Sequence, residues 1–192
     1  MFKSIFLSGL ISVLLTGCSV VSPSGLIAAA RLDPLETDPS DISIAVGVPE
    51  VLRLADADAQ LFFGFAPDGA NTPPPVGTTV PLTVSTETES LTPNAGQRIY
   101  VFGFGTSEAA HLTALQDRIG ALKDRGLTGT GTLSVGITGG CLTGTLTDGL
   151  PVATWIQTSS DGAFVSLTRP TDFLDTLPDQ ERLQLIERLQ PC

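Results

Sequence analysis

Few side chains in this 192-residue chain have the types and spacing that catalysis or metal binding requires. His111 is the single histidine, so a catalytic triad, a His-based zinc site or a His general base would depend on it alone. It stands one residue before the apolar stripe of a predicted helix, which indicates a solvated residue at the helix boundary. No serine has a Gly-x-Ser-x-Gly motif around it, which disfavours α/β-hydrolase chemistry. We therefore assign no catalytic residue, no metal ligand and no cofactor, and we predict that the protein is not an enzyme.

Two further motifs lack parts that a binding site needs. Asp56-Ala57-Asp58 has neither the additional oxygen ligands nor the distal glutamate of a calcium loop, so we expect an exposed turn. Residues 103–108, Gly-Phe-Gly-Thr-Ser-Glu, lie between a predicted strand and a predicted helix, as a dinucleotide loop does. Glu108 replaces the third glycine there, and its carboxylate would repel a pyrophosphate. One hydrolase alternative stays open, because any two of the 20 acidic residues could converge in a cleft with raised pKa values.

The N-terminal residues have the pattern of a secretory signal. Lys3 supplies a positive charge, residues 5–15 form a mainly apolar run, and Leu15-Thr16-Gly17-Cys18 follows. These last four residues resemble the lipobox of bacterial lipoproteins, in which a small residue precedes the cysteine. The resemblance implies that residues 1–17 are removed, that the Cys18 thiol receives a diacylglycerol, and that the new amino group is acylated. The alternative is an uncleaved anchor helix over residues 5–21, which is short for a membrane span.

A lipid on Cys18 determines where the rest of the chain would lie. Stable anchoring needs more than one acyl chain, and a doubly or triply acylated cysteine meets that need. Residues 18–25 would be a short lipidated tether that keeps residues 26–192, predicted as a single globular domain, close to the membrane. Ser19 takes the place where enteric lipoproteins use aspartate to stay in the inner membrane. By this resemblance the protein faces the periplasm and is expected at the outer membrane.

The remaining cysteines, Cys141 and Cys192, are an even pair in a chain predicted to enter an oxidising compartment. We predict a disulfide between them, which would close a loop of about 50 residues and contribute roughly 4 kcal/mol on the chain-entropy account. The alternative is two free thiols. A redox function is disfavoured because the chain has no Cys-x-x-Cys motif.

Several segments have the patterns of β-strands. Apolar and small residues alternate over residues 42–48, and an aromatic run at 61–65 reads as a buried strand. Pro81 interrupts the alternation at 80–84 and predicts an edge strand. Further strands are expected at 99–104, at 128–138 with a short return over 141–146, and in a hairpin around 159–162. The prolines at 73–75 predict an extended surface loop, with a polyproline ligand as the alternative.

Two helices complete the predicted fold. One spans about residues 107–125, where Leu112, Leu115, Ile119 and Leu122 form an apolar stripe, Thr106 or Ser107 can cap the start, and Gly120 would permit close approach to a sheet. The other spans about 178–189, with Leu183, Ile186 and Leu189 on its apolar side. We predict an α+β fold: an antiparallel β-sheet of about five to eight strands with these two helices packed on it.

The formal net charge of −10 bears on partners. An acidic chain is not expected to bind nucleic acid, which requires a basic face, and it gains nothing from anionic headgroups, so lipid must provide the membrane contact. The aromatic residues at 62–65 and 100–104 are most simply core, although an uncovered Phe102 and Phe104 face would form a groove. We predict a membrane-anchored accessory or structural subunit that binds another envelope protein. A module for a small apolar ligand or lipid and the carboxylate hydrolase are the alternatives.

Overall fold

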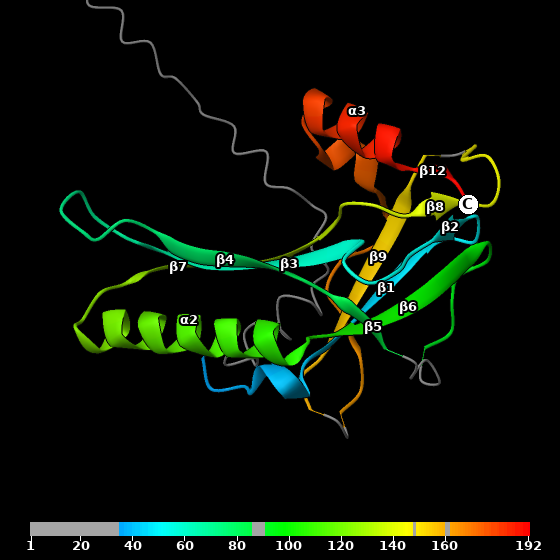
Figure 1. Cartoon of the computed structure of the whole chain (residues 1–192). Helices are drawn as coiled ribbons and strands as arrows, with labels where there is room; N and C mark the ends of the chain where they lie inside the picture. The colour runs from blue at the N-terminus through cyan, green and yellow to red at the C-terminus, as the bar shows by residue number, and fades with distance from the viewer. Residues whose placement is uncertain (1–34, 86–90, 148, 160–161) are drawn as a thin grey trace, which may run out of the picture.

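The computed structural model describes residues 35–85, 91–147, 149–159 and 162–192 of the chain. The predicted signal peptide, Cys18 and the tether lie outside these residues. Within them, two α-helices and twelve strands in three mostly antiparallel sheets confirm the predicted α+β class (Figure 1). The strands do not form one sheet, because they divide between a six-stranded sheet and two three-stranded sheets.

The six-stranded sheet places β1 at its centre. Its strands are β10 (Val165–Ser166), β9 (Pro151–Gln157), β1 (Ser43–Pro49), β6 (Gln97–Gly103) and β5 (Thr83–Ser85), in that order, with β11 (Thr171–Asp172) also paired to β9. The pairing of β9 with β10 confirms the predicted hairpin. The alternation over residues 42–48 is typical of a strand that is buried on one face, but both faces of β1 are covered. The Trp155 ring lies against Gly47, where an added Cβ would come within 3.1 Å of the indole.

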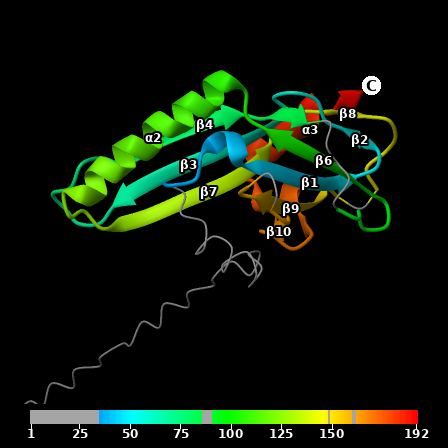
Figure 2. The same ribbon diagram turned by 90° about the horizontal axis from the view of Figure 1, so that it is seen from below.

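The second sheet has the order β4 (Val76–Pro81), β3 (Ala59–Pro67) and β7 (Gly129–Ile137). Helix α2 (Thr106–Asp124) runs along one face of these strands, as Figures 1 and 2 show. The sheet and helix residues that pack between them are buried, and they include the predicted stripe: Leu61, Phe63, Phe65, Val76, Val80, Leu112, Leu115, Ile119 and Leu122. Strand β4 lies at the edge of this sheet, as Pro81 predicted.

The ends of α2 differ in part from the prediction. The helix begins at Thr106, and its N-cap residue is Gly105, which has no side chain to offer. The expected cap from Thr106 or Ser107 is therefore wrong, and the Ser107 hydroxyl instead bonds the Glu108 carboxylate at 2.8 Å. The expected close approach at Gly120 is absent, because no atom beyond its own stretch of helix lies within 4 Å of the position its Cβ would take.

The third sheet joins segments that are far apart in the sequence. It has the order β12 (Gln190–Pro191), β8 (Cys141–Leu142) and β2 (Leu52–Arg53), with β12 parallel to β8. The return over 141–146 was expected to pair with 128–138, and this expectation is wrong. Gly140 has a φ of 133°, which turns the chain so that β8 leaves β7 and pairs with β2.

Two 3₁₀ turns and a second α-helix complete the described elements. A 3₁₀ turn, η1 (Pro39–Asp41), precedes β1, and η2 (Phe173–Thr176) precedes helix α3 (Asp179–Arg188). The predicted apolar side of α3 is wrong in part, because Leu183 and Ile186 are 62% and 48% exposed. The buried side chains of this segment are Leu185 and Leu189. The exposed pair, Leu183 and Ile186, and the buried pair, Leu185 and Leu189, are both at helical spacing. The pairing of the following β12 with β8 determines which pair faces the core.

This assignment predicts different effects for two leucines on one helix. Leu185→Ala is expected to lower the free energy of unfolding by about 2–4 kcal/mol, because it leaves a cavity beneath α3. Leu183→Ala is the matched control and should change it by less than about 0.5 kcal/mol, because the side chain is already in water. Urea denaturation of both variants measures the difference. Equal losses would show that α3 does not dock through Leu185.

Candidate functional site

The predicted disulfide is present and joins β8 to Cys192. The two cysteines have Cα atoms 5.0 Å apart, within the usual range for a disulfide of about 4.4–6.8 Å. The Cys192 amide donates to the Leu142 carbonyl at 3.0 Å, so the covalent link and the parallel β12–β8 pairing reinforce each other. The prediction of the Cys141–Cys192 bond from residue counting is therefore confirmed.

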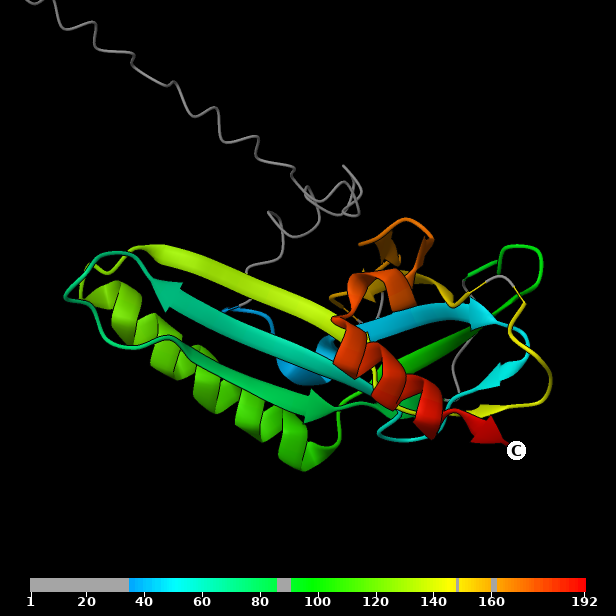
Figure 3. The same cartoon turned by 90° about the horizontal axis from the view of Figure 1, so that it is seen from above.

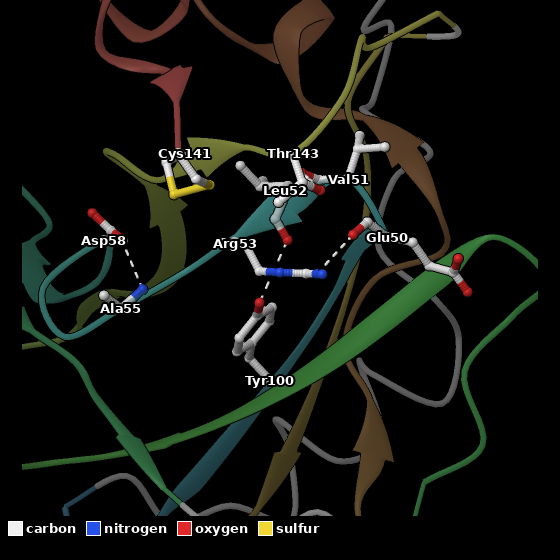
Figure 4. Close-up of a disulfide and its surroundings, with 10 residues drawn as sticks. Glu50, Val51, Leu52, Arg53, Ala55, Asp58, Tyr100, Cys141 and Thr143 are labelled. Carbon is white, nitrogen blue, oxygen red and sulfur yellow. Dashed lines mark hydrogen bonds between the residues drawn. A yellow bond between two sulfur atoms is a disulfide. The ribbon is translucent and has the colours of Figure 1, made fainter.

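The polar side chains around this disulfide bond to backbone carbonyls (Figure 4). The Thr143 hydroxyl donates to the Val51 carbonyl at 3.1 Å, and the Tyr100 hydroxyl donates to the Leu52 carbonyl at 3.4 Å. The Arg53 guanidinium donates to the carbonyl of Glu50 at 2.8 Å. These hydrogen bonds hold β2, β8 and β6 together at one corner of the fold. The disulfide lies at this corner, where it joins β8 to Cys192.

A cleft of about 570 Å³ lies near this corner, beside the ends of β1 and β6. Buried Gln97 accepts from the Asn94 amide at 2.9 Å and donates to the Pro151 carbonyl at 3.3 Å, so the amides of the cleft bond to the protein itself. Glu50 is the single ionisable residue among the described residues that line it. The hydrolase alternative requires at least two acids in a cleft, and the described part of this lining contains one.

The cleft also differs from the pocket that the ligand-binding alternative requires. That alternative expects a cavity lined by Phe and Leu between sheet and helix. The described residues that line this cleft are prolines, polar residues and a few small or aliphatic ones, and none of them is aromatic. On the aromatic strand β6, Phe102 is fully buried and its ring centroid lies 6.3 Å from that of Tyr100, so the Phe102 side chain is covered by other described residues.

The other residues considered from the sequence lie apart from one another. His111 is exposed on α2. Asp56 and Asp58 each accept a backbone N–H, from Val84 and from Ala55, both at 2.8 Å, which confirms an exposed turn. Among the described residues, no group of three or more His, Cys, Asp or Glu side chains is arranged to hold a metal ion.

Hydrogen bonds hold the pKa values of two carboxyl groups, Glu108 and Asp38, below their usual range, opposite to what a general acid requires. The side-chain hydrogen bond from Ser107 is the largest cause that lowers the pKa of Glu108, and the hydroxyl and amide of Ser40 lower that of Asp38 in the same way. Glu108 lies in the first turn of α2, and segment 103–108 forms the expected turn from β6 into that helix.

One uncharged surface is the face of the β4-β3-β7 sheet that points away from α2, here called the outer face. It consists of Gln60, Phe62, Gly64, Ala66, Gly77, Thr79, Pro81, Thr130, Thr132, Ser134 and Gly136, which the strand registers place side by side. Figure 3 views this side, with α2 behind the strands and α3 near one end. None of the eleven side chains is charged, although the chain carries a net charge of −10.

Phe62 lies at the centre of the outer face and is 38% exposed, so the expectation that it belongs to the core is wrong. Its ring covers Gly64 and Gly77, where an added Cβ would come within 2.8 Å and 3.0 Å of the ring. Thr79 and Ser134 flank it as cross-strand neighbours. The sequence signal for this face was present: Phe62 alternates with buried Leu61 and Phe63, so the aromatic run has two sides.

In the described part of the chain, no helix combines the length and the apolar character that crossing a membrane requires. Comparisons of the chain with protein-family models, with curated proteins and with solved structures gave no match.

Proposed function

We propose that this chain is a lipid-anchored protein of the bacterial cell envelope, a non-enzymatic accessory subunit that binds another envelope protein through its outer face. The lipobox-like sequence Leu15-Thr16-Gly17-Cys18 supports the anchor and a periplasm-facing location, and Ser19 after the cysteine supports the outer membrane. The disulfide supports an oxidising compartment, because such bonds persist in the periplasm and are rare in the cytosol.

The observation that carries the binding role is the absence of charge from the outer face of an acidic protein. The centres of protein interfaces are depleted in charged residues and enriched in aromatic ones. Phe62 provides one exposed aromatic ring, and the small residues around it keep the surface flat. Thr79, Thr132 and Ser134 surround the ring with hydroxyl groups that can form hydrogen bonds at the rim.

Site-specific crosslinking in living cells tests this proposal. A photoreactive amino acid at Thr79, next to Phe62, is expected to give one dominant adduct with a second envelope protein, identified by mass spectrometry. The same probe at Asp117, which is exposed on α2 across the sheet, is the control and should not give that adduct.

The affinity for the captured protein then tests whether the Phe62 ring is at the centre of the contact. Phe62→Ala is expected to weaken binding by about 2 kcal/mol, or about thirtyfold, because an aromatic side chain at an interface centre is a typical hot spot. Thr113→Ala on the exposed side of α2 should leave the affinity unchanged. Equal adducts from both probe positions, or an unchanged affinity for Phe62→Ala, would contradict the proposal.

A further inference from the structure

Strand β7 has one edge that no described element pairs with. It is the outer strand of the β4-β3-β7 order, and in Figures 2 and 3 no described helix or strand lies alongside it on the side away from β3. The Thr138 amide donates to the Asp58 carbonyl, and the Asp68 amide donates to the Thr128 carbonyl. The even-numbered residues of β7 therefore form its hydrogen bonds to β3. Because antiparallel ladders alternate, the odd-numbered residues direct their N–H and C=O groups outward: Gly129, Gly131, Leu133, Val135 and Ile137.

This edge lacks the devices that commonly protect a free strand. Edge strands avoid pairing with other chains by carrying lysine, proline or bulges, or by being very short. Strand β4, at the opposite edge, carries Pro81. Strand β7 has nine residues, none of them charged and none proline. Leu133 and Val135 are also only half-buried, so apolar surface continues up to the open edge.

The sequence of β7 is complementary to itself when it is paired antiparallel with Leu133 opposite Leu133. In that register Val135 meets Gly131 and Ile137 meets Gly129, so large side chains face glycines on the α2 side. On the other side Thr132 meets Ser134, hydroxyl against hydroxyl, and Thr130 meets Gly136. Every outward residue meets another outward residue, so all their N–H and C=O groups find partners.

We propose that β7 pairs in this register with β7 of a second copy of the chain. The result is a symmetric dimer with one continuous sheet in the order β4-β3-β7-β7-β3-β4, with both α2 helices on the same side. No charged residue of β7 faces another across the junction, so the acidic character of the chain does not oppose the contact locally. This inference involves the strand edge and a second copy, so it stands or falls separately from the proposed envelope partner.

Two variants at one residue test the pairing. Gly131→Pro removes an outward N–H and leaves the bonds to β3 intact, and no atom lies within 4 Å of the Cβ position. Gly131→Ala is the control, because it adds a Cβ and keeps the N–H. Sedimentation equilibrium of the full chain in density-matched detergent micelles should give two copies for the native and alanine proteins. The proline variant should dissociate at least about tenfold more readily, since two hydrogen bonds are lost per dimer.

Cysteine crosslinking tests the register. One tagged copy carries Thr132→Cys and a differently tagged copy carries Ser134→Cys, and mild oxidation is expected to join them. Replacing the first by Thr79→Cys, an equally exposed threonine on the same face but on β4, should abolish the product. A single-copy mass for the native chain would overturn the proposal. It would also be overturned if Gly131→Pro, shown by circular dichroism to keep the native structure, formed dimers as readily as the native chain. Equal crosslinking from Thr79→Cys would overturn the proposed register.

Discussion

The Cys18→Ala variant of the full chain is expected to carry no covalent lipid and to retain residues 1–17. The physical reason is that only a thiol at this position can accept the diacylglycerol, and the proposed cleavage depends on that modification. Each buried methylene of an acyl chain contributes about 0.8 kcal/mol to membrane binding, so the loss of two or three chains removes the whole anchor. Metabolic labelling with a fatty acid and intact-protein mass measure both changes.

A second variant separates lipid anchoring from retention by an uncleaved apolar segment. Residues 1–17 are replaced by a signal peptide that is cut without lipidation, and Cys18→Ala is kept. This protein should be recovered in the soluble periplasmic fraction, while the native chain stays with the outer membrane. If the native chain carries no lipid and keeps its first residues, the anchor is an apolar helix and the lipoprotein assignment is wrong.

Replacing both bonded cysteines, as Cys141→Ala with Cys192→Ala, is expected to lower the free energy of unfolding by about 4 kcal/mol. The crosslink spans a sequence separation of 51 residues, and its loss gives the unfolded chain more conformational entropy. Cys192 is exposed and Cys141 is half-buried, so lost side-chain packing adds little to this effect. Urea denaturation should also show a steeper dependence on denaturant, because the uncrosslinked chain exposes more surface when it unfolds.

The native chain under reducing conditions is the control for this pair of substitutions. A thiol reductant should lower its stability to that of the double variant and leave the double variant unchanged. A native chain whose unfolding does not respond to the reductant would show that the disulfide is not what holds β12 to β8.

The elements that could be predicted from the sequence are those whose patterns are local. Helix α2 follows from the spacing of Leu112, Leu115, Ile119 and Leu122, since one turn of helix fixes which side chains share a face. The edge character of β4 follows from Pro81, which cannot donate to a ladder. The Cys141–Cys192 bond follows from counting, because one assigned cysteine leaves a single pair.

The errors occur where a pattern permits two answers. On α3, the pair Leu183 and Ile186 and the pair Leu185 and Leu189 are both at helical spacing, and only docking chooses between them. Phe62 was placed in the core with its neighbours, although successive strand residues point to opposite sides. Both errors arise because local periodicity defines faces but does not say which face is covered.

The sequence by itself determined the class of fold and the cysteine pairing, because both depend on residue type and on the number of residues of that type. Only the tertiary structure decided that the strands form three sheets, that β8 pairs with β2, and that no described element covers the outer face or pairs with the β7 edge. The physical reason is that strand pairing joins segments distant in the chain. The exposure of a face then depends on which other elements pack against it, and no local pattern records that.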